Sequence, residues 1–380
     1  MSDRLNRTIN HMKKKAGPDI PYGSDRVLLH TCCAPCSGAI VEYLMNNGIR
    51  PVIFYCNPNI YPVEEYRIRR DECARHAASL GLDMIEAEYD HEGWKAYTAG
   101  LENEPERGPR CLKCFKYRLE QCARFAHQNG YQVITSTLDS SRWKSHGQII
   151  EAGQWATQQF PGVSFWERNW RQGGLQERRG EIIREMGFYN QLYCGCEYSM
   201  ANMPVGEKTD VRKRIRKMVA TMDQESMQHQ SAQAWERLEQ TKAFQESRHI
   251  LAYWPMADEI DTRPLIRKWA GKKKFSLPSI AGDILVVKEF LGEQYLTEGE
   301  SFNIPEPVGQ QLSNMDSIDL VIVPGRAFDR EGYRLGRGKG YYDRLLPQIP
   351  SAIKAGACFD CQKLPAVPRD SHDIAMDFII

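Results

Sequence analysis

Ten of the twelve cysteines in this 380-residue chain stand before residue 200, and this clustering limits what the first half can fold into more than any other feature. Seven of them form three short groups, namely Cys32, Cys33 and Cys36, then Cys111 and Cys114, then Cys194 and Cys196. The N-terminal segment is polar and charged and lacks the apolar core of a signal peptide, so we expect a cytoplasmic protein. Because structural disulfides are rare in that reducing compartment, these cysteines predict metal or redox chemistry.

Composition excludes several classes of protein. Hydrophobic residues make up 42% and charged residues 26% of the chain, a balance typical of globular proteins, and 380 residues suffice for two domains. No apolar run approaches the length of a membrane span, so we expect no membrane partner. The formal net charge of +1 gives no global field that would attract nucleic acid, and such a partner has to be argued from local features.

The first half alternates short apolar runs with amphipathic stretches. Strands are expected at residues 26–30, 51–56, 84–89 and 132–138, with helices over 37–47 and 64–80. This alternation predicts an α/β fold with a mainly parallel sheet and helices on both faces. Ligands of such folds bind outside the carboxyl ends of the strands.

The second half begins with a polar, helix-favouring stretch over residues 205–249. We therefore place the domain boundary at Met203–Pro204, which gives domains 1–203 and 204–380. A second α/β pattern follows, with strands expected at 249–254, 273–280, 283–290, 317–325 and 353–359. The two halves share no motif, so each needs its own functional interpretation.

The first expected strand runs directly into Cys32, Cys33 and Cys36, which open the next helix. A helix N-terminus lowers the pKa of a thiol, and the thiolate is the form that binds iron or zinc. The C-x2-C pair Cys111 and Cys114 also precedes a helix and can reach one metal centre. The cysteines expected in the apolar core instead are Cys56, Cys73 and Cys122. A zinc site that only braces loops is the structural alternative.

The third group, Cys194 and Cys196, has the spacing C-x-C. Two cysteines this close cannot form a relaxed disulfide, and a strained disulfide is easily reduced. The pair is therefore better suited to a redox switch or an electron relay than to a structural crosslink.

Four ordered segments carry a resemblance to a known family: HTCCAPCS, YCNPNIYPVEEYRIR, EPERGPRCLKCFKYRL and YNQLYCGCEYS. From about Val27 to Ser199 the chain resembles the QueH family of epoxyqueuosine reductases. The resemblance implies a Rossmann-like, HUP-like fold and reduction of epoxyqueuosine to queuosine in the anticodon loop of tRNA, with an unidentified electron donor. It also implies a [4Fe–4S] cluster on Cys32, Cys33, Cys111 and Cys114 and a redox-active pair at Cys194 and Cys196. Cys36 matches the motif without an assigned role.

One stretch of this half combines aromatic and basic residues that suit stacking on bases and pairing with phosphates. Its members are Trp143, Trp166, Arg168, Trp170 and Arg171. We take it as a hypothetical contact with tRNA. The rival function is that of an ATP-dependent tRNA-thiolating enzyme, which needs a glycine-rich phosphate loop after the first strand. The sequence TCCAPCS at that place argues against this reading.

The second half carries a glycine-rich basic loop after the strand expected at 318–324. Gly336, Gly338 and Gly340 alternate with Arg337 and Lys339, and a helix is expected to begin at about residue 341. Exposed backbone N–H groups and two cations suit a polyphosphate. Asp343 follows the loop and is a plausible Mg²⁺ ligand.

The segments MADEIDTRPLI, FNIPEP and PGRAFDREGYRLGRGKGYYDRLL resemble 5-formyltetrahydrofolate cyclo-ligase from about Lys208 to Ile380. The resemblance implies a three-layer α/β/α fold and the use of Mg²⁺ and ATP to phosphorylate the formyl oxygen of 5-formyltetrahydrofolate, giving 5,10-methenyltetrahydrofolate. Motif by motif it implies ATP binding by Lys208, Arg212, Gly336, Arg337, Gly338, Lys339, Gly340, Tyr341 and Tyr342. It further implies folate contact by Glu259, substrate contact by Arg337, and Mg²⁺ binding by Asp343 and Asp373.

One position departs from that family. Ser279 stands where its members often have arginine, so a nucleotide-binding module without catalytic activity is the alternative for this half. Cys358 and Cys361 form a C-x2-C pair with no second pair nearby, and we expect both to be structural. Taken together, the two halves predict a bifunctional enzyme.

Overall fold

The computed structural model describes residues 20–141, 144–189, 191, 193–200, 205–299, 304–370 and 373–380. The chain divides into two compact units, Met1–Met200 and Ala201–Ile380. The boundary expected at Met203–Pro204 lies outside the described residues and stays a prediction. No helix in the described part of the chain is long and apolar enough to cross a membrane.

The first unit is built on a five-stranded parallel sheet, which confirms the predicted α/β class. The strands lie in the order β3 (Met84–Glu86), β2 (Val52–Tyr55), β1 (Val27–His30), β4 (Val133–Ser136) and β5 (Ser164–Phe165). The first four were expected from the sequence. The fifth has only two residues, too few for a recognisable apolar run.

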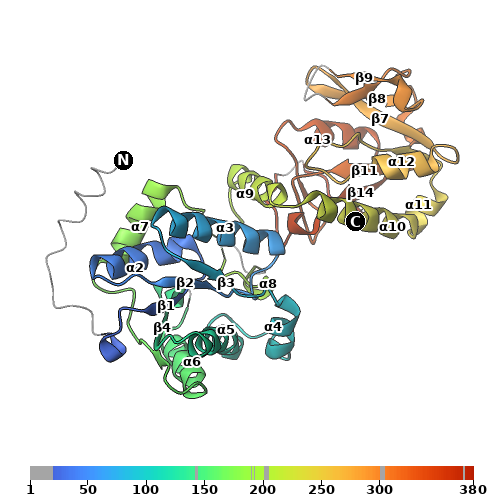
Figure 1. Cartoon of the computed structure of the whole chain (residues 1–380). Helices are drawn as coiled ribbons and strands as arrows, with labels where there is room; N and C mark the ends of the chain where they lie inside the picture. Colours follow the sequence, from blue (N-terminus) through green and yellow to red (C-terminus); the bar gives the residue numbers. More distant parts are fainter. Residues whose placement is uncertain are drawn as a thin grey trace. The chain divides into compact units, whose positions relative to one another are not determined.

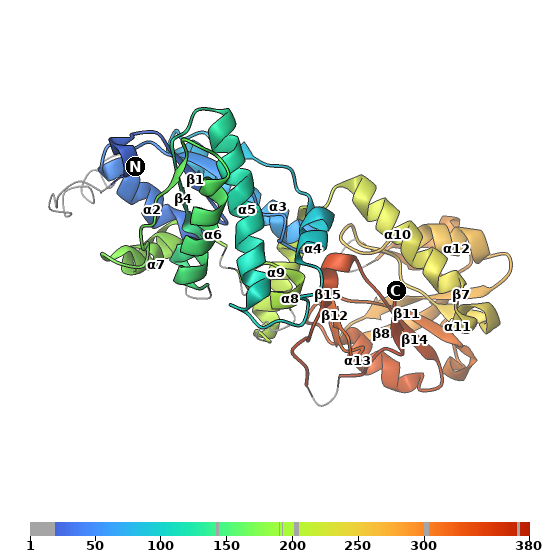
Figure 2. The same ribbon diagram turned by 90° about the horizontal axis from the view of Figure 1, so that it is seen from below.

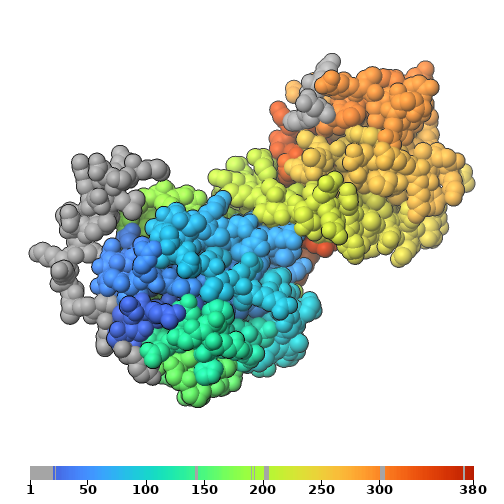
Figure 3. All heavy atoms as spheres, in the orientation of Figure 1, coloured from blue at the N-terminus to red at the C-terminus, as the bar shows by residue number. Residues whose placement is uncertain are grey.

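Helices cover both faces of this sheet, as Figure 1 shows. One face carries α2 (Ala34–Asn46), α3 (Val63–Ser79) and α7 (Leu175–Met186), and the other carries α5 (Pro109–Gln128) and α6 (His146–Gln158). The space-filling view shows that α3 forms part of the outer surface of the unit (Figure 3). Two short helices, α4 (His91–Thr98) and α8 (Glu197–Met200), complete the unit. Cys56, Cys73 and Cys122 are buried, as expected for core residues.

The central strands bring two loops to the same edge of the sheet. β1 pairs in parallel with β4, so the residues that follow each strand lie at neighbouring carboxyl ends. After β1 the chain enters α2 through Cys33 at the N-cap with a proline in the first turn, a position where proline is favoured. After β4 it makes the short 3₁₀ helix η2 (Thr137–Ser140) and then reaches Lys144. This edge holds the first candidate site.

The second unit has a six-stranded sheet that is parallel except for one edge pair. Its order is β16 (Phe378–Ile379), β14 (Ile353–Ala357), β11 (Leu320–Pro324), β6 (His249–Leu251), β7 (Lys274–Ala281) and β8 (Ile284–Glu289), with β7 and β8 antiparallel. Two small sheets join β9 (Leu296–Glu298) to β10 (Pro305–Pro307), and β12 (Ala327–Asp329) to β13 (Arg334–Leu335) and β15 (Lys363–Leu364).

Helices flank this sheet as well. The polar stretch at its start forms α9 (Lys208–Ala220), α10 (Gln224–Glu239) and α11 (Lys242–Glu246), followed later by α12 (Arg263–Trp269) and α13 (Tyr341–Leu345). Figure 2 shows α10 and α12 on one side of the sheet and α13 on the other. Cys358 and Cys361 are buried, as expected, although Cys358 lies just beyond β14 and not within a strand.

Candidate functional sites

The first candidate site begins with three buried thiols at the end of β1. The sulfur atoms of Cys32, Cys33 and Cys36 all lie within 4.8 Å of one another, and Cys32 Sγ is 3.8 Å from Cys33 Sγ. Hydrogen bonds from Cys33 and Cys36 hold the pKa of Cys32 well below its ordinary value, whereas burial raises the pKa of Cys33. Negative charge in the group therefore concentrates on Cys32.

Cys111 of the second group and both cysteines of the third group line one cavity, whose volume is about 300 Å³ when its opening to solvent is included. Its lining residues are Glu106, Arg107, Arg110, Cys111, Phe115, Lys144, Cys194, Cys196 and Ser199. Cys114 is buried beside Trp94 and Cys196. Among the described residues, Cys36 completes the close thiol group, and Cys111 and Cys114 do not join it. The four-cysteine ligand set therefore stays a prediction.

Lys144 links the thiol group to the cavity, although no sequence motif predicted it as a site residue. Its Nζ lies 3.9 Å from Cys32 Sγ, and the same residue lines the cavity with Cys111 and Cys194. The adjacency of β1 and β4 is the signal that would have found it. In a parallel sheet, the loops that follow neighbouring strands lie together.

The surroundings of the thiols suit a negatively charged sulfur-ligated group. The amide of Gln191 donates to Cys33 Sγ at 3.2 Å, and the backbone N–H of Arg107 donates to Cys111 Sγ at 3.3 Å. Thr137 Oγ1 lies 3.5 Å from Cys32 Sγ, and buried Arg118 stabilises negative charge on Cys114 and Cys32. Such donors and cations orient thiolate ligands and tune the group that they hold. The donor set therefore fits an iron–sulfur cluster.

The C-x-C pair lies in a tightly held loop with both thiols free. Gly195 has φ 135°, and a Cβ there would approach Ile60 Cγ1 to 3.1 Å, so only glycine fits. Arg69 Nη1 donates to the Cys194 carbonyl at 3.1 Å and forms a buried ion pair with Glu65. Burial raises the pKa of Cys196 to about 12. The Glu65–Arg69 pair, four residues apart on α3, was not recognised from the sequence.

The hypothetical tRNA contact is wrong for its two described tryptophans. Trp166 and Trp170 are buried in the core between the sheet and α2, and Trp170 Nε1 donates to Thr135 Oγ1 at 3.1 Å. Arg171 binds backbone carbonyls, and Arg168 lies over Tyr43 with its Cζ 4.4 Å from the ring centroid. Trp143 lies outside the described residues. Trp166 and Trp170 therefore stabilise the core and are not available to stack on bases.

The second candidate site is an open cleft of about 900 Å³ in the second unit. Its predicted members are Glu259, Gly336, Arg337, Lys339, Gly340, Tyr341, Tyr342 and Asp343. Apolar and aromatic side chains complete the wall, including Tyr253, Trp254, Ile280 and Leu285. Lys208, Arg212, Gly338 and Asp373, which were also predicted, do not line this cleft. A cleft with an apolar wall and a few convergent charges suits an organic ligand that carries a charged group.

The glycine loop adopts the backbone conformation that its sequence favours. Gly338 has φ 108° and Gly340 has φ 67°, both in the region where side chains are strained. Arg212 on α9 donates from Nε to the Gly336 carbonyl at 2.8 Å, and its guanidinium lies 3.6 Å from the position of a Cβ on Gly338. Arg212 therefore supports the loop from outside the cleft.

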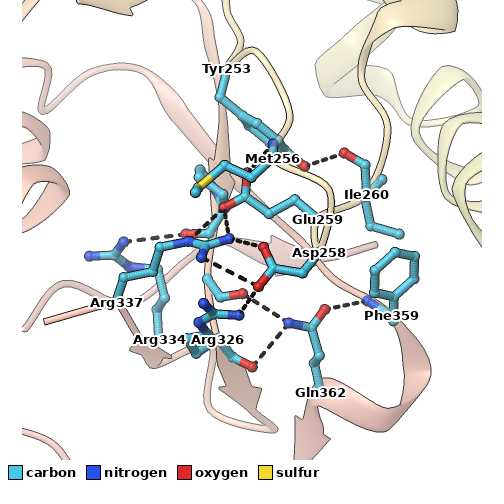
Figure 4. Close-up of polar contacts among 12 residues, drawn as sticks. Tyr253, Met256, Asp258, Glu259, Ile260, Arg326, Arg334, Arg337, Phe359 and Gln362 are labelled. Atoms are coloured by element: carbon cyan, nitrogen blue, oxygen red, sulfur yellow. Dashed lines mark hydrogen bonds and ion pairs between the residues drawn. The ribbon is translucent and has the colours of Figure 1, made fainter. Parts of the chain in front are cut away.

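A network of charged side chains surrounds Arg337, as Figure 4 shows. Arg337 donates to Glu259 Oε1 from Nε at 3.0 Å and from Nη2 at 2.7 Å, and it also binds Asp258. Arg326 binds the other oxygen of Asp258. Burial raises the pKa of Asp258, but hydrogen bonds from the two arginines outweigh burial and lower it. Asp258 and Arg326 were not predicted, although Asp258 directly precedes Glu259.

The two predicted Mg²⁺ ligands each contact a cation. Asp343 binds Arg334, whereas Asp373 Oδ2 lies 3.2 Å from Lys208 Nζ. Lys208 also binds Asp370 at 2.6 Å. Among the described residues, neither aspartate belongs to a group of three possible metal ligands. The Mg²⁺ assignment therefore stays a prediction.

Ser279, the departure from the expected arginine, has a defined partner. Its hydroxyl donates to the carboxylate of Glu306, and the Ile280 N–H donates to Glu306 Oε1 at 3.0 Å. Glu306 lines the cleft. Ser279 therefore helps to fix a carboxylate in the wall.

Two families of known proteins match this chain, one in each half. Residues 27–202 match the family described as epoxyqueuosine reductase QueH, and residues 204–380 match the 5-formyltetrahydrofolate cyclo-ligase family. The chain is 43% identical over 197 residues to the epoxyqueuosine reductase QueH of Histophilus somni, covering 52% of this chain and 81% of that protein.

The second half has its own relatives. It is 27% identical over 187 residues to the 5-formyltetrahydrofolate cyclo-ligase of Mus musculus, covering 46% of this chain and 92% of that protein. The NMR structure of Aquifex aeolicus 5,10-methenyltetrahydrofolate synthetase is 34% identical, with a TM-score of 0.42, and covers 45% of this chain and 88% of that chain.

Proposed function

We propose that this chain is a bifunctional enzyme, since its first half belongs to the QueH epoxyqueuosine reductase family and its second half to the 5-formyltetrahydrofolate cyclo-ligase family. The observation that carries the first activity is the buried thiol group beside a cavity that also holds the C-x-C pair. The cleft with its glycine loop and charge network supports the second.

In the first half, we assign a [4Fe–4S] cluster to Cys32, Cys33, Cys111 and Cys114. The bound cluster would supply single electrons. Cys194 and Cys196 would supply two electrons by closing to a disulfide, while the epoxide oxygen of the tRNA base leaves as water with two protons. The Arg69–Glu65 pair holds the loop of these cysteines in place. An external electron donor would return the disulfide to the dithiol.

In the second half, we assign the phosphates of ATP to the loop Gly336 to Tyr342, with Lys208 and Arg212, and Mg²⁺ to Asp343 and Asp373. The formyl oxygen of 5-formyltetrahydrofolate would attack the γ-phosphorus and displace ADP. N10 would then attack the activated formyl carbon and lose its proton, and phosphate would leave as the ring closes. Glu259 would contact the folate and Arg337 the transferred phosphoryl group. Because Arg337 now binds Asp258 and Glu259, the ligand must take over these contacts.

Two assays on the full chain test this proposal. Anaerobic protein given a chemical reductant should convert tRNA that contains epoxyqueuosine to queuosine tRNA. Mass spectrometry of the tRNA nucleosides measures this conversion. The same protein should form 5,10-methenyltetrahydrofolate from 5-formyltetrahydrofolate only when Mg²⁺ and ATP are present. The absorbance of the product measures its formation. A failure of either assay with active control enzymes contradicts the corresponding half of the proposal.

A further inference from the structure

We propose that Lys144 is a positioning residue whose buried ammonium group sets the reduction potential of the sulfur-ligated centre in the first unit. The proposal rests on the proposed function only in requiring that the cysteines bind an iron–sulfur cluster. It assigns a role to one side chain that the motifs do not name.

Lys144 carries a buried positive charge that lies apart from carboxylates. Lys144 is 6% exposed, and its Nζ lies 3.9 Å from Cys32 Sγ. Among the described residues, no carboxylate lies within 4.0 Å of this ammonium group. A buried charge without a counter-charge is costly, so the sulfur atoms must supply the negative charge that stabilises it.

The ammonium group of Lys144 also lies between groups of cysteines. Lys144 contacts Cys32 on one side and lines the cavity with Cys111, Cys194 and Cys196 on the other. One cation therefore faces both the predicted cluster ligands and the predicted redox pair.

Hydrogen bonds hold the loop that carries Lys144 in place. Arg171 donates from Nε to the Asp139 carbonyl and from Nη2 to the carbonyls of Ser141 and Lys144, each at 2.7 Å. The buried carboxylate of Asp139 accepts from the Trp170 N–H at 3.1 Å. These contacts fix the backbone of Lys144 in a way that an ordinary surface lysine does not need.

The physical consequence follows from Coulomb's law. Reduction adds an electron to the centre, and a cation at one of its sulfur ligands stabilises the more negative, reduced state. In a buried site the effect is weakly screened by salt. Removing the ammonium group should therefore lower the midpoint potential, whereas a cation of the same charge at the same place should preserve it.

The experiment measures the midpoint potential of the anaerobically prepared, iron-loaded full chain by redox titration followed with electron paramagnetic resonance. The variants are Lys144→Met, Lys144→Arg and Arg171→Gln. The matched control is Lys113→Met, which removes a lysine between Cys111 and Cys114 whose Nζ instead donates to the Tyr97 carbonyl at 3.1 Å. Iron and sulfide contents are measured for every protein.

The expected result is a lower potential in Lys144→Met, a smaller shift of the same sign in Arg171→Gln, and the wild-type potential in Lys144→Arg and Lys113→Met. A wild-type potential in a cluster-loaded Lys144→Met protein would overturn the inference and leave the proposed function intact. An equal shift in Lys113→Met would also overturn it, because any nearby charge would then suffice. If Lys144→Met loads no cluster, Arg171→Gln decides by the same criterion. A wild-type chain that binds no iron–sulfur cluster overturns both proposals.

Discussion

The two candidate sites treat buried charge in opposite ways. At the thiol group of the first unit, Lys144 has no carboxylate partner among the described residues and lies against sulfur. In the cleft of the second unit, Arg337, Arg326 and Arg334 each bind a carboxylate of the same chain. Under the proposed function, the first site would be organised in advance for a negative group that stays bound. The cations of the second site would stay paired with carboxylates until a substrate displaces them.

The largest effect that separates the two sites is expected from Cys194→Ser. Without the dithiol, reduction of the epoxide in tRNA should fall below detection, because one thiol cannot close a disulfide. The iron content and the folate activity should remain at the wild-type level. Single-turnover assays and metal analysis check this outcome. Retained reductase activity would show that the C-x-C pair is not the two-electron donor.

Arg337→Lys tests whether the guanidinium group of Arg337 acts in the cleft of the second unit. Lysine keeps the charge but loses the two parallel N–H groups that now bind Glu259, so the kcat/KM of the cyclisation should drop about 100-fold. Arg263→Lys is the matched control, because that exposed arginine binds the half-buried Asp261 and does not line the cleft. Equal losses in both variants would contradict a role for Arg337 at the site.

Gly338→Ala tests the loop through its backbone. A side chain at φ 108° costs on the order of 1–3 kcal/mol of strain, which should raise the KM for ATP by roughly tenfold. The control is Gly162→Ala in the first unit, where φ is 87° and no atom lies within 4 Å of the new Cβ. That variant should lose stability without any change in the KM for ATP. An unchanged KM for ATP in Gly338→Ala, with a raised KM in Gly162→Ala, would show that the loop does not bind ATP.

The smallest effect is a pH dependence of stability from Asp258. Its pKa is lower in the folded state than in the unfolded state, so its contribution is present above the unfolded value of about 3.9. The contribution is lost as the pH falls through the folded value. Asp258→Asn should therefore flatten the acid limb of the stability profile of the second unit by about 1 kcal/mol or less, since the carboxylate is half-exposed. Urea unfolding between about pH 5 and pH 3 measures this difference. Identical profiles would show that the arginine contacts do not stabilise the fold.

The sequence predicted the repeating elements better than the polar contacts. The four longer strands of the first unit and the helix that follows Cys33 were recognisable because apolar runs and proline carry local signals. β5 was missed because two residues carry no period. Trp170 was assigned to the wrong environment, since an aromatic beside a basic residue looks alike in a core and on a surface.

Lys144 and Asp258 show why parts of both sites were not predictable. Each owes its place to a partner far away in sequence: Lys144 to Cys32 across neighbouring strands, and Asp258 to Arg326 and Arg337. Such pairs depend on which strands are adjacent, and no local pattern encodes this. The cysteine spacings and the glycine loop could be recognised in the sequence because each motif lies within one short segment.

The central claim is that the cysteines of the first half hold an iron–sulfur cluster. The most direct test is metal and sulfide analysis with an absorbance spectrum of the anaerobically purified full chain, beside Cys111→Ala and the core control Cys122→Ala. A bound [4Fe–4S] cluster predicts about four irons and four sulfides per chain in the wild type and in Cys122→Ala, and their loss in Cys111→Ala. Zinc without labile sulfide in the wild type would contradict it.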